Sequence, residues 1–561
     1  MASRSSTAAP DANVPLSLEL TSSSQGESSL ASQETSILLA GRRLAVVFLS
    51  FVVAFCLVAV DQTILSTALP TIASHFNAVS DLSWIASAYF LPQAAFMLFF
   101  GRVLTIAPAK PVFLTSIAIF ELGSLFCAVS PSVNFLIFGR AVAGFGAAGL
   151  WVSIMSIVGR VTTMAQRPLL MGLFGAVFAV SSIVGPLLGG VFAGMNLNFH
   201  AVIKNSYTTL PITERVSWRW CFYINLPLGA FAIVIVALFL PNIAASDEKG
   251  SPMQRWKRLD WVGTSLSFAM VTFLLIALQW GGNEKPWNSA SVVTLLVLSG
   301  GSGIAFFAWE RRMGWNAILP LHIFLRESIL GACFTSFFLL SQGVVLPLLY
   351  QSRGSSATQS GIDIIPYMMS GVITVVIAGG IITVSGYPWP FLVFFPLIAS
   401  AAFGLLYTIS PETSASRIIG YQILLGIGLG AAIQNTVVVA QGEVVNEPSL
   451  VPLATSAVTF MQLIGSSMGL AAAGAVFTSA LRSELSIHLP DVPSSLIDAV
   501  ASSVTVIFSL PEQEMTAAIA AYVSAVDRVY LIGVPAAALA SLSALLVDRK
   551  KITLQQQPGA V

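Results

Sequence analysis

The sequence predicts an all-α polytopic membrane protein with 14 transmembrane helices. Of its 561 residues, 56% are hydrophobic and only 9% are charged, whereas soluble domains carry about 25% charged residues. The apolar residues gather in long runs, and a run of about 20 can cross a bilayer as a helix. Fourteen such runs occur, at about 45–69, 82–100, 111–129, 134–158, 168–192, 221–240, 259–279, 290–309, 328–350, 361–383, 388–409, 416–440, 453–479 and 529–547.

Composition divides the chain into six parts. Residues 1–44 are rich in Ser, Ala and Thr and contain no apolar run, which is typical of a disordered cytoplasmic tail rather than of a signal peptide. The other five parts are a six-helix N-terminal bundle (45–240), a polar and basic linker (241–258), two inserted helices (259–309), a six-helix C-terminal bundle (328–547) and a second cytoplasmic tail (548–561).

Basic residues in the connecting segments predict the orientation. With a cytoplasmic N-terminus, the inner segments hold 17 Lys and Arg residues and the outer segments hold eight. Because Lys and Arg concentrate on the cytoplasmic side, we expect both termini and the linker to lie there. The outer loops at about 193–220 and 480–528 are long, and apolar stretches in the second one suit a helix lying at the membrane surface.

A faint internal repeat supports the division into two halves. A Leu-Pro pair at 69–70 and another at 346–347 each precede a new helix by the same distance. The glycines of GRAVAGFGAAG at 139–149 recur in YQILLGIGLGAA at 421–432, which places Arg140 opposite Gln422. Repeated halves are frequent in secondary transporters. The inserted helices lie outside this repeat, giving an arrangement of six, two and six.

Three ionisable residues fall inside the predicted spans of the first half: Asp61, Glu121 and Arg140. A charge there costs roughly 2.5–3.5 kcal/mol on insertion scales, so it needs a partner or an aqueous cavity. All three lie about 9–12 Å below the outer surface at about 1.5 Å per helical residue, so they can pair. A breakable pair would be a basis for proton coupling. The alternatives are a static ion pair, carboxylates that stay hydrated, or an arginine that reaches the headgroups.

The fifth predicted helix combines a proline with several glycines. Pro186 removes a backbone hydrogen bond and bends the helix. Gly185, Gly189 and Gly190 allow another helix to approach closely. Such a helix can rock against its neighbour, although the same residues also serve ordinary packing.

The remaining polar residues in the spans are amides, and we expect them to line a substrate cavity: Gln93, Asn225, Gln342, Gln434, Asn435 and Gln462. The second half contributes amides but no deep charge. Many Phe residues lie near them, although most of these would face lipid or pack helices. An apolar, aromatic cavity with a few amides suits a bulky, weakly charged organic molecule.

Several function classes have no support in the sequence. The four cysteines show no metal-ligand spacing, so we expect no disulfide, metal or other cofactor. No phosphate-binding loop or nucleophile motif occurs, so an enzyme is not expected. The net charge of +1 gives no indication of a nucleic-acid partner. The expected partners are a small-molecule substrate, protons and the lipid bilayer.

These motifs resemble the major facilitator superfamily, in particular its 14-helix drug:proton antiporter branch. The similar stretches are VDQTILSTALP at 60–70, GRAVAGFGAAG at 139–149, VGPLLGG at 184–190, SWRWCFYINLPLGA at 217–230 and LDWVG at 259–263. Further details, FELGSLFCA at 120–128 and SATQSGIDIIP at 356–366, look most like fungal toxin efflux carriers. The resemblance covers residues 45 to 480. It implies two six-helix bundles, alternating access, export driven by proton entry, and Asp61 and Arg140 in the coupling network.

The loop between the second and third helices departs from the family pattern. It reads GRVLTIAPAKP, with Gly101, Arg102 and Lys110 as candidate gating residues. Thr105 stands where the family has an acid, and Ala109 stands where it has a base. The charge pairs by which this loop latches the outward-facing state are therefore expected to be weaker or built differently.

The sequence thus favours a proton-coupled antiporter that exports a fungal secondary metabolite, toxin or drug, as a monomer in the plasma membrane. A siderophore or vacuolar amino-acid transporter of the same fold, in a vacuolar membrane for the latter cargo, remains an alternative. Such cargo would favour charged groups in both halves, which the second half lacks. A membrane sensor without transport activity is a further alternative, against which the retained Asp61 and Arg140 argue.

Overall fold

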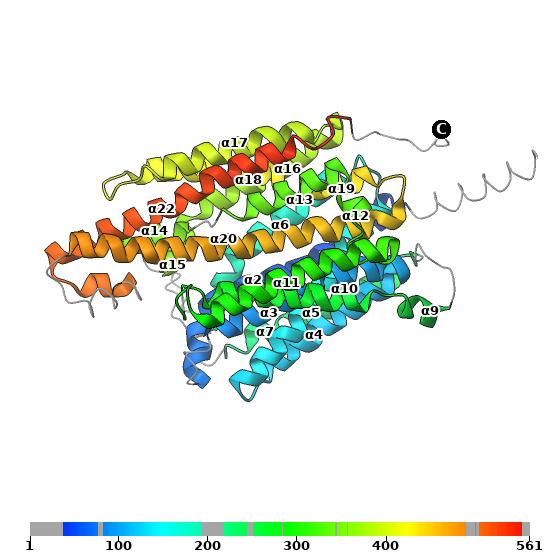
Figure 1. Cartoon of the computed structure of the whole chain (residues 1–561), viewed down its shortest axis with the longest axis horizontal. Coiled ribbons are helices and arrows are strands. Elements are labelled where there is room, and N and C mark those ends of the chain that lie inside the picture. The colour runs from blue at the N-terminus through cyan, green and yellow to red at the C-terminus, as the bar shows by residue number, and fades with distance from the viewer. Residues whose placement is uncertain are drawn as a thin grey trace, which may run out of the picture.

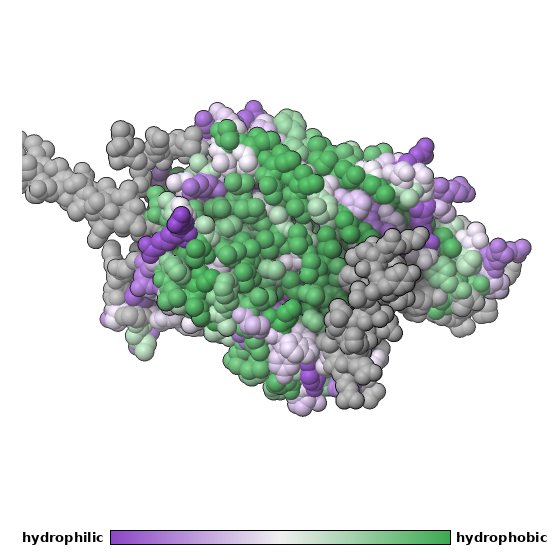
Figure 2. All heavy atoms as spheres, turned by 180° about the vertical axis from the view of Figure 1, so that it is seen from behind, coloured by the Kyte–Doolittle hydropathy of each residue, from purple (hydrophilic) through white to green (hydrophobic). Residues whose placement is uncertain are grey.

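The described part of the chain is helical almost throughout. The computed structural model describes residues 38–76, 82–192, 217–243, 251–282, 284–342, 345–355, 357–489, 500 and 504–551. Within these ranges, 13 helices are long and apolar enough to cross a membrane. Figure 2 shows one broad hydrophobic face with hydrophilic residues gathered toward its two ends, as expected for a surface that contacts lipid.

The N-terminal half consists of α2 (Gly41–Phe76), α3 (Leu82–Ile106), α4 (Ala109–Ala128), α5 (Val133–Val161), α6 (Arg167–Phe192), the short α7 (Trp220–Tyr223) and α8 (Asn225–Phe239). Local sequence accounts for several boundaries. Ser132 caps α5 by accepting a hydrogen bond from the backbone N–H of Phe135, a frequent role of serine at helix starts. α4 packs against the consecutive helix α5, and α2 packs along α6, two helices that run in the same direction.

The linker and the inserted helices follow. Ser251 and Gln254 form a capping box that begins α9 (Pro252–Lys257). Asp260 caps α10 (Trp261–Trp280), and Ser289 caps α11 (Ala290–Met313). Gly314 ends α11 with a φ of +59°, a conformation that glycine adopts readily. The 3₁₀ turn η3 (Gly314–Asn316) and α12 (Leu321–Phe324) then lead into the next half.

The C-terminal half consists of α13 (Glu327–Leu340), α14 (Leu346–Ser352), α15 (Ala357–Asp363), α16 (Ile365–Ser385), α17 (Trp389–Leu406), α18 (Ala415–Ile433), α19 (Asn435–Glu443), η4 (Pro448–Leu450), α20 (Val451–His488), η5 (Val504–Ser509) and α22 (Glu512–Ala544). Its closest pairs are α16 with α18, α17 with α18 and α17 with α22.

The predicted count of 14 spans is not confirmed, because the run at 328–350 does not form one helix. It divides into α13 and α14. At about 1.5 Å per residue, the 14 residues of α13 reach only about 21 Å. Pro347 lies in the first turn of α14, where a missing N–H is tolerated and a new helix can begin.

The predicted outer loop at 480–528 is also largely helical. α20 continues to His488, and α22 begins at Glu512 rather than near 529. The extensions pack against each other around the buried residues Leu481, Ala518 and Tyr522, which stabilises helix beyond the apolar run. Of the surface helix suggested for this loop, residues 490–499 and 501–503 lie outside the described ranges.

The two halves lie along each other with their helices parallel to the long axis of the molecule (Figure 1). α6 packs against α16 across the halves, and α3 packs against α20. The inserted helices pack together beside α3, and α10 also reaches α20. We call the end that carries residues 251–258 the linker end; α9 marks it in Figure 1.

The repeat predicted from the glycines has a structural counterpart. A Cβ added at Gly144 would collide with the carbonyl oxygen of Tyr89, and one added at Gly426 would collide with the carbonyl oxygen of Tyr367. The two glycines therefore serve the same purpose in the two halves, since each lets its helix press directly on the backbone of a neighbouring helix.

Close packing joins the halves toward the linker end. Gly101 of α3 lies against Ser456 of α20, and a Cβ at Gly172 of α6 would lie 2.8 Å from the carbonyl oxygen of Val375. Gln441 of α19 donates a hydrogen bond of 3.1 Å to the carbonyl oxygen of Met155. The halves are thus in direct backbone contact at this end.

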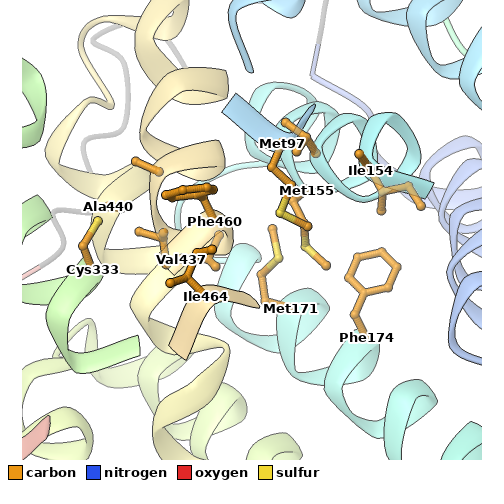
Figure 3. Packing of buried hydrophobic residues seen from close by; sticks show 14 of the residues in the cluster. Met97, Ile154, Met155, Met171, Phe174, Cys333, Val437, Ala440, Phe460 and Ile464 are labelled. Atoms are coloured by element: carbon orange, nitrogen blue, oxygen red, sulfur yellow. The ribbon is translucent and has the colours of Figure 1, made fainter. Parts of the chain in front are cut away.

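Apolar side chains continue this contact. We call the residues Met97, Met155, Met171, Val437, Phe460 and Ile464 the methionine seam. Figure 3 shows the methionines of α3, α5 and α6 lying toward Phe460 and Ile464 of α20. Methionine is flexible and polarisable, so it fills irregular gaps between packed surfaces.

Candidate functional site

A buried ion pair lies inside the N-terminal half. Nη1 of Arg140 lies 2.5 Å from Oδ2 of Asp61, and each side chain is only 1% exposed. Arg140 also donates from Nε to the carbonyl oxygen of Ile85 at 3.4 Å. Its guanidinium lies over the ring of Tyr89, 4.4 Å from the centroid. α2 supplies the acid, α5 supplies the base, and α3 surrounds the base with a carbonyl and an aromatic face.

Asn225 joins this pair to two further helices. Its Nδ2 donates to Oδ1 of Asp61 at 3.3 Å and lies 3.1 Å from Oγ of Ser124. The asparagine is fully buried at the start of α8. The sequence suggested that Asn225 lines a substrate cavity, but the structure places it in the ion-pair network. Helices α2, α4, α5 and α8 therefore meet at Asp61 through polar contacts.

Glu121 does not join the ion pair, although it was expected at the same depth. The residue is 9% exposed, and neither carboxylate oxygen has a hydrogen-bond partner in the described part of the chain. The carboxylate lies instead against Gly229 of α8, where an added Cβ would collide with Oε1. Helical rise fixes the depth of a residue, but the rotation of the helix decides what the side chain faces.

The glycines of α6 hold it tightly against α2. A Cβ at Gly185 would collide with Thr63, and one at Gly189 would collide with the backbone oxygen of Ile64. Thr67 donates from Oγ1 to the carbonyl oxygen of Pro186 at 2.8 Å. The glycines Gly185, Gly189 and Gly190 are all buried. α2 and α6 are therefore in direct backbone contact close to Asp61.

Three of the predicted amides gather where α18 gives way to α19. Asn435 donates from Nδ2 to the carbonyl oxygen of Ala431 at 2.7 Å. Gln462 donates from Nε2 to the carbonyl oxygen of Ile433 at 3.3 Å. Gln434, at the junction itself, is 8% exposed. Carbonyl groups at the end of a helix lack partners within the helix. At least two of these amides donate hydrogen bonds to such carbonyl groups, where α18 ends and α19 begins.

The other two amides lie elsewhere. Gln93 of α3 accepts a hydrogen bond of 3.2 Å from Gln62 of α2 and is 1% exposed. Gln342 follows the end of α13 and is 2% exposed, and neither of its side-chain polar atoms has a hydrogen-bond partner among the described residues. Buried amide groups without partners are costly, which makes Gln342 a candidate for contact with substrate.

The basic residues of the predicted gating loop have structural partners. Lys110 donates from Nζ to the carbonyl oxygens of Ala237 and Leu240, each at 2.8 Å, and so caps the end of α8. Arg102 donates to Oδ1 of Asn316 at 3.3 Å. The loop thus ties the N-terminal half to η3, while Gly101 supplies the contact with α20 described above.

Two polar features of the second half were not expected from the sequence, namely the burial of Asp527 and the partner of Gln422. Asp527 lies within α22, and its Oδ1 is buried without a partner among the described residues. It was missed because the apolar run begins two residues later. Gln422, opposite Arg140 in the repeat, donates from Nε2 to the hydroxyl of Tyr350 at 2.5 Å. The aligned glycines of the repeat placed Gln422 opposite Arg140, but they did not indicate the partner of its side chain.

Comparison with known proteins identifies the family. The model of the Major Facilitator Superfamily matches residues 51–470. The MFS-type transporter astH of Aspergillus oryzae is 35% identical over 511 residues, covering 90% of this chain and 86% of its own. The rubrofusarin-specific efflux pump aurT of Gibberella zeae is 36% identical over 524 residues, covering 92% and 91%. The MFS-type transporter ptmT of Penicillium ochrochloron is 36% identical over 500 residues, covering 88% and 83%.

Solved structures agree on the fold. The human organic anion transporter MFSD10 (TETRAN) matches with a TM-score of 0.57 and 14% identity, covering 91% of this chain and all of its own. The fucose:proton symporter FucP of E. coli matches with a TM-score of 0.52 and 12% identity, covering 90% and 98%. The curated relatives are transporters and efflux pumps, not enzymes. The chain is therefore a multi-pass membrane protein of the Major Facilitator Superfamily.

Proposed function

We propose that this protein exports a hydrophobic small molecule, a fungal secondary metabolite, toxin or drug, in exchange for protons by alternating access. The observation that carries the proposal is the ion pair of Asp61 and Arg140, buried at 1% exposure within a single half. A buried pair is weak as a stabilising device but well suited to a switch. The names of several relatives, among them the efflux pumps aurT, bfoC and aunC, support the direction of transport.

Protonation of Asp61 is the coupling step. The proton removes the charge that holds Arg140, and it disturbs the hydrogen bond from Asn225. Thr63 lies half a turn further along α2 and donates to the carbonyl oxygen of Ser181 in α6 at 3.0 Å. Because α6 packs against α16, a shift of α2 reaches the contact between the halves.

The energetics allow such an exchange. One proton moving down a potential of about 100 mV releases roughly 2.3 kcal/mol, and each pH unit adds about 1.4 kcal/mol. Together they would sustain a gradient of roughly 500-fold for a neutral solute exchanged 1:1.

The proposed setting is the plasma membrane, with the protein a monomer and both termini cytoplasmic. In that orientation the linker end faces the cytoplasm. The contacts of Gly101 with Ser456 and of Gln441 with Met155 then close the cytoplasmic side in this conformation. Substrate release to the outside is the step that this conformation serves.

The test is an accumulation assay in a yeast that lacks its main drug exporters. Cells expressing wild type, Asp61→Asn or the surface control Asp548→Asn are loaded with fluorescent hydrophobic dyes and fungal toxins, with and without a protonophore. We expect wild type and Asp548→Asn to lower accumulation of at least one compound, and both Asp61→Asn and the protonophore to abolish the effect. Efflux that persists in Asp61→Asn would overturn the role of the ion pair. Uptake of any compound in place of efflux would overturn export.

A further inference from the structure

The inserted helices carry a second buried pair of ionisable groups, which transport through the two halves does not explain. Asp260 immediately precedes α10, and Glu310 lies in the last turn of α11. Asp260 is 2% exposed and Glu310 is fully buried. Two acids at such burial, near the same end of adjacent helices, need a source of compensation.

Each acid has one oxygen that is satisfied by N–H donors. Oδ1 of Asp260 accepts from the backbone N–H of Gly263 at 2.7 Å and from Nε1 of Trp309 at 2.8 Å. Oε2 of Glu310 accepts from the backbone N–H of Leu319 at 2.7 Å. These bonds hold both carboxyl groups in fixed orientations.

The other oxygen of each acid is buried and lacks a hydrogen-bond partner in the described part of the chain: Oδ2 of Asp260 and Oε1 of Glu310. Both point to the same place. A Cβ added at Gly263 would collide with Oδ2 of Asp260 and would lie 2.6 Å from Oε1 of Glu310. Glycine at this position leaves the two oxygens room to face each other.

Within the described part of the chain, no ion pair joins a basic side chain to either acid. α10 carries no charged side chain, and neither does α20 between Val451 and Leu481. Arg102 of α3 donates to Asn316, and Arg255 of α9 donates to the carbonyl oxygen of Ile106. The basic side chains of Lys257, Arg258, Arg311 and Arg312 are exposed. On α12 and the residues that follow it, the ring of His322 lies tilted against that of Trp315, with centroids 3.7 Å apart, and Arg326 pairs with Glu447.

We propose that Asp260 and Glu310 form a proton-binding site, in which one proton is held between Oδ2 of Asp260 and Oε1 of Glu310. Two facing carboxylates in a dry site cannot both ionise, and a shared proton satisfies both orphan oxygens at once. A metal ion is a poor fit, because no group of three His, Cys, Asp or Glu side chains able to hold one occurs among the described residues.

The bound proton stabilises the contact between three segments at the linker end. It joins α10 to α11, and through the bond from Leu319 to Glu310 it also holds the segment that leads into the C-terminal half. Loss of the proton would place two negative charges side by side and push these elements apart. The site is separate from Asp61 and Arg140, so it goes beyond the transport function proposed above.

The first experiment detects the proton itself. The full-length protein in lipid nanodiscs is titrated with base while infrared spectroscopy follows the carbonyl band of protonated carboxyl groups. Wild type is compared with Glu310→Gln, with Asp260→Asn and with the exposed control Glu412→Gln. In each of the first two variants an amide N–H replaces the shared proton, so we expect the band to lose one carboxyl group per chain. The control should match wild type.

The second measurement is thermal unfolding against pH for the same four proteins. A group that binds its proton more tightly when folded stabilises the protein at low pH and loses that effect as pH rises. We therefore expect the melting temperature of wild type to fall toward alkaline pH, and the fall to be smaller in Glu310→Gln and Asp260→Asn. An infrared band equal to that of wild type in both variants would overturn the proposal, and so would an unchanged pH dependence of melting.

Discussion

The two halves share a packing frame but differ in what they bury within it. In the N-terminal half, Gly144 presses on the backbone of Tyr89, and Arg140 one turn away holds Asp61. In the C-terminal half, Gly426 presses on the backbone of Tyr367, and Gln422 at the matching position holds a tyrosine hydroxyl. The comparison indicates that close packing is a requirement of the fold, while an ion pair at this position of the repeat is an addition to the N-terminal half.

The largest effect is expected from removing that charge. Arg140→Leu leaves the buried carboxyl group of Asp61 without its cationic partner, which should cost about 3–5 kcal/mol of unfolding free energy. The double variant Asp61→Asn with Arg140→Leu should recover most of this stability but not transport. Unfolding in detergent, with dye efflux measured in parallel, gives both values. If Arg140→Leu were as stable as wild type, the pairing of Arg140 with Asp61 would not contribute to stability.

The next largest effect should be equal in the two halves. An added Cβ would collide with the backbone nitrogen of Phe120 at Gly146 and with that of Ala399 at Gly428. We expect Gly146→Val and Gly428→Val each to cost about 1–3 kcal/mol by overpacking. Gly404→Val is the control, because no atom lies within 4 Å of a Cβ there. A cost confined to one half would show that the packing frame is not shared.

A smaller effect is expected at the uncharged counterpart of Arg140. Gln422→Leu removes one neutral hydrogen bond to Tyr350, so the cost should be about 0.5–1.5 kcal/mol. Efflux in the yeast assay should be retained, in contrast to Arg140→Leu. Loss of efflux with normal stability would assign Gln422 a part in transport and weaken the contrast between the halves.

The smallest effect is expected where charge lies at the surface. Lys550 pairs with Asp548 at 2.9 Å, and their side chains are 84% and 52% exposed. Surface ion pairs contribute little to stability because water and salt screen them, so Lys550→Gln should shift the melting temperature little at low salt and less at high salt. A shift as large as that of Arg140→Leu would show that burial does not set the scale of these effects.

The sequence predicted those features that depend on composition and spacing along one helix. Apolar runs located the spans, and helical rise placed Asp61 and Arg140 at one depth, where the structure pairs them. It named Glu121 but did not predict that this side chain faces α8 rather than the ion pair, because a helix that is apolar all round gives no indication of its rotation. The division of the run at 328–350 was also missed, because an apolar run has the same composition whether it forms one helix or two.

Partners brought from distant segments were beyond sequence reasoning as well. Asp260 and Glu310 are 50 positions apart, and their contact depends on the way α10 and α11 lie together. The start of α22 at Glu512 depends on packing against α20 rather than on hydrophobicity. In both cases tertiary contact, not local pattern, decides the structure.

The methionine seam has a consequence for the electrical behaviour of transport. Its six side chains carry no charge, and the hydrogen bond of Gln441 that accompanies it is neutral. In the proposed alternating access, the seam itself would therefore move no charge through the membrane field, whereas a charge that crosses the whole potential gains about 2.3 kcal/mol per 100 mV. Opening of the seam should be insensitive to voltage, and any dependence of export on membrane potential should enter with the proton at Asp61 or with a charged substrate.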